Sequence, residues 1–253
     1  MNNVFEMIAQ QNAEMKPIDV HKLVKGKDVD PKLKEMTTAK VGMPGLAQAI
    51  TFAEWLPFAA KTYHCSPDPK DYILVPNIVM PSEIPNRNGV GFPLQQLVRF
   101  NPETGCQGFR TAVGKGTYAD HQNNTVAPLA KGVIVDSFMR PLEGFKGGVW
   151  KLLFLLAYDR SKDQALTNAI LAGTRTNYSM GAYLTKYTCS ICGRDRGQCV
   201  HLSAQKGSVN FRKVGNQLAY SQAYEPIFFE TSSVEDPAFV SSITGADHLL
   251  ITR

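Results

Sequence analysis

A cluster of cysteines and one histidine constrains this chain more than any other feature of its sequence. The spacing is Cys-x2-Cys-x6-Cys-x-His, formed by Cys189, Cys192, Cys199 and His201. Two thiolates three positions apart can bind one ion from a tight turn, and the later Cys/His pair completes a tetrahedron. All four positions are used, so we expect a closed, structural zinc site, a zinc knuckle at residues 189–201. A disulfide, or four unrelated residues, is the alternative.

Length and composition allow an ordinary globular protein. The chain has 253 residues, enough for one large domain or one domain with an appendage. A net charge of +5 permits contact with acidic partners but does not demand nucleic acid. No apolar run has membrane-spanning length, and the N-terminus lacks the apolar region of a signal peptide. The few cysteines suit a reducing cytoplasm, and we expect no membrane partner.

Residues 1–65 differ from the remainder of the chain. Helical patterns occur at 4–15 and 46–61, and a lysine-rich stretch lies between them. The second pattern places its apolar residues largely on one side, as an amphipathic helix does. We therefore predict two parts: a helical N-terminal arm at 1–65, packed on the main domain or on a partner, and a main domain at 66–253.

The main domain has mostly strand patterns. Strands are predicted at 72–80 with a break at Pro76, and at 131–139, 149–158, 208–212, 217–221 and 226–231. One helix is predicted over 163–172, with Ser161 and Gln164 in capping-box spacing at its start and Gly173 at its end. The fold class is therefore α+β, mainly β.

Ser179 follows that helix on a strand-like run and is a candidate nucleophile. The small residues Gly181 and Ala182 come just after it and leave space for a substrate backbone to approach. Most serines on strands are only polar residues of one face, so this pattern alone does not establish catalysis.

Several stretches, taken in order, resemble a known family. They are PNRNGVGFP, DHQNN followed by GVIVDS, a helix ending in glycine, NYSMGA, and FFETSSVEDPAF, which contains a Glu-x-Ser-x-Val-x-x-Pro-Ala pattern. Together they are similar to the prohead (capsid-maturation) serine proteases of tailed phages, in particular the core-protease branch of large myophages. These proteases share the herpesvirus assemblin fold. The resemblance covers residues 72–239, and the cysteine cluster is an insertion in its pattern.

The resemblance implies a set of catalytic residues. The family's histidine falls on His121, its serine on Ser179 and its acid on Glu230, with Asp159 or Asp163 as alternatives for the acid. Assemblins use a second histidine in the third role, but the position of His201 beside Cys199 favours the metal site.

These roles fit the chemistry of acyl transfer. A serine hydroxyl needs a base within reach, and a histidine held by a carboxylate supplies one. Backbone N–H groups, or Arg175, would stabilise the oxyanion.

The implied fold is an assemblin-like β-barrel core with surrounding helices. The implied function is a serine endopeptidase that cleaves phage scaffold and major capsid proteins, as a homo-oligomer inside the assembling prohead in the host cytoplasm. One alternative is an inactive, capsid-associated structural protein that keeps the protease fold. Another is a nucleic-acid-binding virion protein built on the zinc knuckle. The single knuckle, the modest charge and the single nearby aromatic pair, Tyr183 and Tyr187, disfavour nucleic acid.

Overall fold

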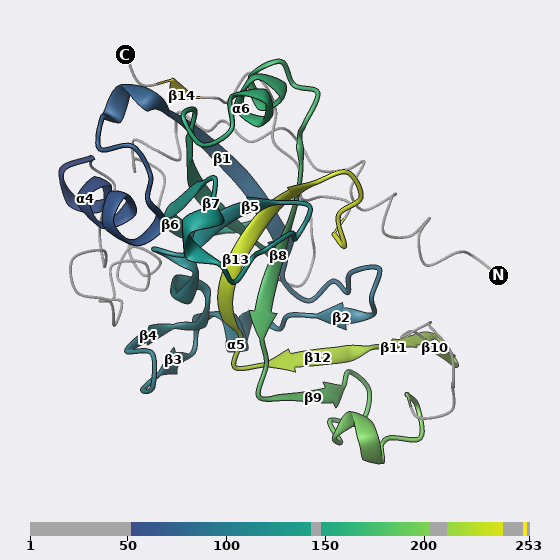
Figure 1. Cartoon of the computed structure of the whole chain (residues 1–253). Coiled ribbons are helices and arrows are strands. Elements are labelled where there is room, and N and C mark those ends of the chain that lie inside the picture. Colours follow the sequence, from purple (N-terminus) through teal and green to yellow (C-terminus); the bar gives the residue numbers. More distant parts are fainter. Residues whose placement is uncertain (1–51, 143–147, 203–211, 240–249, 252–253) are drawn as a thin grey trace.

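The computed structural model describes residues 52–142, 148–202, 212–239 and 250–251 (Figure 1). The predicted helix at 4–15 and most of the predicted strand at 208–212 lie outside these ranges. The described part is α+β with strands predominating, and its main feature is a curled seven-stranded sheet of order β14-β1-β7-β6-β5-β13-β8. None of its helices is both long and apolar enough to cross a membrane.

The main sheet contains β1 (Tyr72–Pro81), β5 (Gly116–Ala119), β6 (Gly132–Pro141), β7 (Trp150–Asp159), β8 (Asn177–Tyr183), β13 (Ile227–Val234) and β14 (Leu250–Ile251). Smaller sheets contain β2 (Val90–Gly91), β3 (Phe100–Asn101), β4 (Cys106–Gln107), β9 (Lys186–Cys189), β10 (Arg212–Val214), β11 (Gln217–Ala219) and β12 (Ser221–Tyr224). The α-helices are α4 (Phe52–Tyr63), α5 (Leu94–Val98) and α6 (Gln164–Leu171). In the described ranges, four short 3-10 helices lie at Pro69–Asp71, Gly108–Ala112, Ala127–Leu129 and Arg196–Gln198.

The centre of the sheet is the antiparallel set β1, β7 and β6. The sequence of β7 is almost continuously apolar because the sheet is covered on both faces. Alternate β7 residues such as Phe154 and Leu156 pack in one cluster, and Leu155 and Ala157 pack in the other. The strands predicted at 131–139 and 149–158 are thus confirmed as β6 and β7.

Helix α4 covers one face of this sheet. It is the described part of the helix predicted over 46–61. Its buried residues Trp55, Ala59 and Tyr63 share a cluster with Val133 and Val135 of β6. This helix, which the prediction assigned to the arm, therefore packs on the main domain.

Two local predictions are wrong. Strand β1 is not broken at Pro76, because beyond Leu74 its only paired neighbour among the described residues is β7, and proline is tolerated on a strand with one open side. Helix α6 is capped by Asp163, which accepts the Leu166 N–H at 2.9 Å, and not by Ser161. The helix end at Gly173 is confirmed.

The strands β8 and β13 continue beyond the main sheet into a smaller lobe. Strand β9 follows β8 after two residues, and β12 precedes β13, with β9 and β12 paired antiparallel. Figure 1 shows this part at the lower right, with β9, β10, β11 and β12. Cys189 of the predicted metal site is the last residue of β9. We call residues 184–202 and 212–224 the knuckle lobe.

Gly132 tests how closely β6 and its paired neighbour β7 approach each other. A Cβ at Gly132 would lie 1.9 Å from the backbone oxygen of Ala157, which the sheet holds in place. We predict that Gly132→Ala lowers the free energy of unfolding by about 3 kcal/mol or more, measured by urea denaturation. Gly197→Ala is the control, since its added Cβ would meet only the Asp195 side chain at 3.3 Å. Equal stability of the two variants would contradict this packing.

Candidate functional site

Ser179 and Glu230 lie on neighbouring strands of the main sheet. In the antiparallel pair β8–β13, Ser179 is opposite Ser232, and Gly181 is opposite Glu230. Directly opposite residues point to the same face, and residues two apart on one strand do so as well. The pairing therefore places Ser179, Ser232 and Glu230 on one face.

The carboxylate of Glu230 is completely buried and holds two partners. Its Oε1 lies 2.9 Å from Nδ1 of His121, and its Oε2 accepts a hydrogen bond from the Ser232 hydroxyl at 2.6 Å. A buried carboxylate is costly unless its oxygens are hydrogen-bonded, and these contacts meet that requirement. The sequence prediction that Glu230 contacts His121 thus agrees with the geometry, although 109 residues separate them.

Gly181 makes room for this arrangement. A Cβ at that position would lie 2.8 Å from Oε1 of Glu230 and 2.4 Å from the ring of Phe229. Any other residue would therefore displace the carboxylate or the ring. In the sequence, Gly181 suggested space for a substrate backbone; in the structure, its missing side chain makes space for the Glu230 carboxylate.

His121 lies in a tight turn directly after β5. The N–H of Gln122 donates to the oxygen of Ala119, and the two central residues, Asp120 and His121, have φ values of 51° and 55°. Such left-handed backbone is costly for residues other than glycine and persists where surrounding contacts impose it. Here those contacts are the Glu230 carboxylate on His121 and Arg175 on Asp120.

Arg175 has a different role from the one considered in the sequence. Its guanidinium pairs with Asp120 and bonds both the hydroxyl and the backbone oxygen of Ser233, each at 3.0 Å. These contacts hold the His121 turn against β13. Arg175 is therefore committed to positioning the turn, and backbone N–H groups remain the predicted oxyanion donors.

The electrostatics of the site raise the pKa of His121. The hydrogen bond to Glu230 raises the pKa of His121 above its ordinary value; partial burial lowers it, and the charges of Glu230 and Asp120 raise it again. Because Nδ1 faces the carboxylate, Nδ1 carries the proton in the neutral ring, and Nε2 keeps its lone pair. That is the tautomer that a general base needs.

Ser179 itself is partly exposed on the edge strand β8. Its backbone oxygen accepts a hydrogen bond from Thr231 at 3.1 Å. Within the described residues, its hydroxyl makes no hydrogen bond with the His121 ring. Catalytic hydrogen bonds are often long before substrate binds, so this arrangement is compatible with the predicted pairing of Ser179 and His121.

The alternative acids lie in structural roles. Asp159 is buried and accepts the N–H groups of Ser66 at 2.6 Å and Ser161 at 2.8 Å. Asp163 caps α6 and pairs with Lys131 at 3.1 Å. Neither contacts His121, so the geometry favours Glu230 as the acid.

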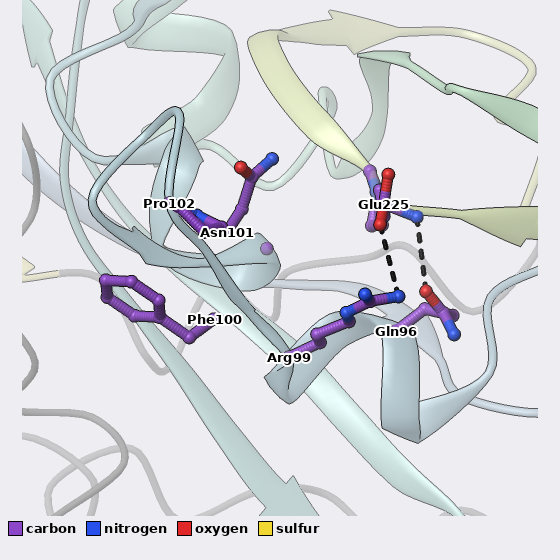
Figure 2. Close-up of a pocket in the computed structure, with 8 residues that line it drawn as sticks. Gln96, Arg99, Phe100, Asn101, Pro102 and Glu225 are labelled. Atoms are coloured by element: carbon purple, nitrogen blue, oxygen red, sulfur yellow. Dashed lines mark hydrogen bonds and ion pairs between the residues drawn. The ribbon is translucent and has the colours of Figure 1, made fainter.

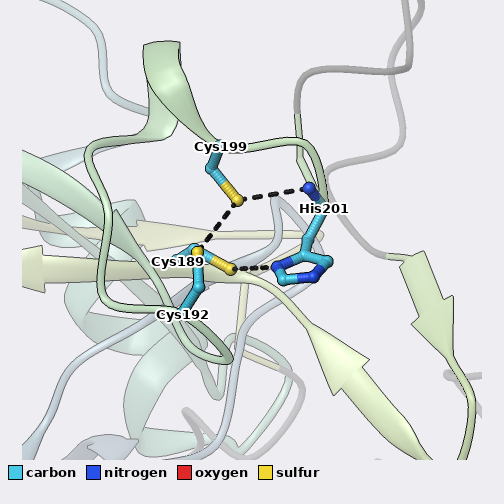
Figure 3. Close-up of side chains that lie close together, drawn as sticks. All are labelled: Cys189, Cys192, Cys199 and His201. Atoms are coloured by element: carbon cyan, nitrogen blue, oxygen red, sulfur yellow. Dashed lines mark hydrogen bonds between the residues drawn. The ribbon is translucent and has the colours of Figure 1, made fainter.

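The second predicted site also comes together in the structure. The ligand atoms of Cys189, Cys192, Cys199 and His201 all lie within 4.8 Å of one another (Figure 3). The Cys192 and Cys199 sulfurs are 3.5 Å apart, and Cys189 Sγ is 3.6 Å from His201 Nδ1. Ligands around a tetrahedral ion with bonds of about 2.3 Å would be separated by about 3.8 Å, whereas a disulfide needs about 2.0 Å. The cluster is therefore compatible with a metal site and not with a disulfide.

The local backbone supports this cluster. The N–H groups of Ile191 and His201 point at the sulfurs of Cys189 and Cys199, at 3.4 and 3.2 Å, and such bonds stabilise thiolates. Gly193 adopts a φ of 67° to close the turn between the first two cysteines and the rest of the loop. His201 faces this cluster and not Ser179, which agrees with its assignment as a ligand.

A small pocket lies at the junction of β12 and β13 (Figure 2). Arg99 pairs with Glu225 at 3.1 Å across it, and the Glu225 N–H donates to Gln96 at 3.4 Å. Glu225 has a φ of 48°, so these contacts fix the bend between the lobe and the main sheet. None of the predicted site residues lines this pocket.

Sequence reasoning missed three residues that support the site. They are Ser232, which donates to Glu230; Gly181, whose lack of a Cβ leaves space for the Glu230 carboxylate; and Arg175, which anchors the His121 turn. Ser232 was visible within the Glu-x-Ser-x-Val pattern, but its hydrogen bond to Glu230 was not. No protein-family model, curated protein or solved structure matches the chain.

The His121–Glu230 contact can be tested by titration. We predict that Glu230→Gln lowers the pKa of His121 towards its ordinary value of about 6.5, measured by NMR of the imidazole protons. Glu235→Gln is the control and leaves the pKa unchanged, because Glu235 is exposed and contacts Arg175 instead.

The same shift predicts a pH dependence of stability. The pKa of His121 is higher in the folded protein than in the unfolded chain. The stabilisation that His121 contributes is therefore complete at pH values below its unfolded-state pKa, and it is lost as the pH rises through its folded-state pKa. A His121 pKa that is the same in the wild type and in Glu230→Gln would contradict this contact.

Proposed function

We propose that this chain is a serine endopeptidase of the prohead core protease type, with Ser179 as nucleophile, His121 as base and Glu230 as the orienting acid. The observation that supports it best is the buried Glu230 carboxylate on Nδ1 of His121, beside a serine on the same face of the sheet. The order of sequence motifs and the curled, strand-rich fold are consistent with an assemblin-like protease.

The chemistry follows from these positions. Nε2 of His121 removes the proton from the Ser179 hydroxyl as the oxygen attacks the substrate carbonyl. The imidazolium so formed is stabilised by Glu230 and gives its proton to the leaving amine. Water then attacks the acyl-enzyme with His121 again as base, which releases the acid product and restores the serine.

Strand β8 offers a place for the substrate. It is the end strand of the seven-stranded sheet among the described residues, so its outer edge can pair with an added strand. An extended polypeptide bound there would run past Ser179. Phage scaffold and major capsid proteins, cleaved inside the assembling prohead by a homo-oligomeric enzyme, are the substrates that the family resemblance implies.

The metal site would hold zinc in this proposal. Three thiolates and one imidazole at tetrahedral spacing suit Zn²⁺ better than the harder divalent ions. With all four positions taken by protein, the ion would stabilise the lobe and take no part in the reaction.

The nucleophile is tested by substitution. Ser179→Ala and His121→Ala should each abolish cleavage of co-expressed scaffold and capsid proteins as fully as the double variant, because the two residues act as a unit. Ser161→Ala is the matched serine control, because Ser161 is exposed two residues beyond β7 and its hydroxyl donates to Asp159 and not to His121, and this variant should cleave normally. Fragment sizes on gels provide the measurement. If wild type and Ser179→Ala give the same fragments, or neither gives any, the inactive structural reading replaces this one.

Zinc is tested separately from activity. Protein purified without chelator should contain one zinc per chain, and Cys199→Ser should lose most of it because a tetrahedral site cannot spare a buried ligand. Cys106→Ser, at a buried cysteine outside the cluster, should retain the metal. The measurement is elemental analysis by mass spectrometry. Metal-free wild-type protein would rule out the zinc site.

A further inference from the structure

The knuckle lobe carries most of the net charge of the chain. Its exposed cationic residues are Lys186, Arg194, Arg196, Arg212 and Lys213. The described part of the lobe has one carboxylate, Asp195, so its formal charge is +4 before the metal and its thiolates are counted. Subtracting that from the chain's +5 leaves +1 for all the other residues. The net positive charge of the chain is therefore concentrated in this lobe.

The lobe lies at the end of the strand that carries Ser179. Among the residues that the structure describes, β8 is the end strand of the main sheet, and β9 is the end strand of the small sheet β2-β12-β9. Only two residues separate β8 from β9, so one open edge leads from Ser179 towards Lys186. Seven residues of extended chain span at most about 23 Å. A polypeptide bound along β8 can therefore reach the lobe with residues a short distance from the bond that is cut.

The aromatic residues of the lobe favour a polypeptide over nucleic acid as the partner. The guanidinium of Arg196 lies 5.9 Å from the ring centre of Tyr187, and the ammonium of Lys186 lies 4.9 Å from that of Tyr224. The ring of Tyr220 packs on β2, and its hydroxyl donates to the main domain. Single-stranded nucleic acid needs open aromatic faces for base stacking, and these tyrosines are engaged. An acidic polypeptide needs no open aromatic face, because its carboxylates bind by ion pairs with the exposed Lys and Arg side chains.

We propose that the knuckle lobe is a docking site for an acidic segment of the polypeptide that the Ser179 site cleaves. This inference rests on the proposed protease function. The lobe would select substrates with clustered Asp and Glu near the cleavage site, by charge attraction outside the reacting residues. Such selection acts on substrate capture, so it changes KM and leaves the chemical step alone.

The experiment measures binding, which does not depend on cleavage. Full-length Ser179→Ala protein is titrated against fluorescein-labelled decaglutamate, and anisotropy gives the Kd. In that background, Arg194→Gln with Lys213→Gln should weaken binding roughly tenfold. The matched control, Lys61→Gln with Lys70→Gln, removes the same charge from exposed positions outside the lobe and should leave the Kd unchanged. Binding should also be lost between about 0.05 M and about 0.5 M salt.

Two outcomes would overturn the proposal. If both double variants weaken binding equally, net charge and not the lobe attracts the peptide. If a single-stranded oligonucleotide of equal length binds more tightly than decaglutamate and is lost in the same lobe variant, the lobe is a nucleic-acid site. Far-UV circular dichroism and zinc content of each variant confirm that the lobe is intact. This experiment measures binding and not cleavage, so a failure of the proposed docking site can be distinguished from a failure of the proposed protease function.

Discussion

A buried carboxylate, that of Glu230, is the constraint on which the rest of the site depends. Taken out of water on β13, which lies between β5 and β8, this carboxylate needs hydrogen-bond donors, and they are His121 and Ser232. Meeting that need holds the His121 turn in left-handed backbone and requires glycine at position 181. The orientation of the histidine is thus a consequence of satisfying the buried acid.

The two candidate sites are parts of one ribbon. Strands β8 and β13 carry Ser179 and Glu230, and their continuations β9 and β12 lead to the cysteine cluster. The loop at residues 86–89 contacts both ends of this ribbon: Arg87 pairs with Asp236 beyond β13, and the Gly89 oxygen accepts the Ser221 N–H at the start of β12. This loop is part of the motif PNRNGVGFP, so its place in the structure gives that motif a physical reason.

Predictions succeeded where the controlling interactions are local. The cysteine cluster could be found because its four residues lie within a short loop. The end of α6 could be found because Gly173 adopts the left-handed backbone that ends a helix. The strands β6 and β7 were found from their apolar runs. The cap of α6 was misassigned because both Ser161 and Asp163 can cap, and only the backbone path into the helix decides between them. The break at Pro76 was misjudged because its cost depends on which neighbours β1 has.

By itself, the sequence determined the strand-rich class, the four residues of the Cys/His cluster and, through the order of its motifs, the candidates His121, Ser179 and Glu230. Only the tertiary structure decided which acid meets the histidine, because that contact depends on the parallel pairing of β13 with β5, whose end carries the His121 turn. It also decided that Arg175 anchors the turn and that β8, the end strand of the main sheet in the described part of the chain, leads to a positively charged lobe. These features arise from residues far apart in the chain, and no local pattern encodes which strands become neighbours.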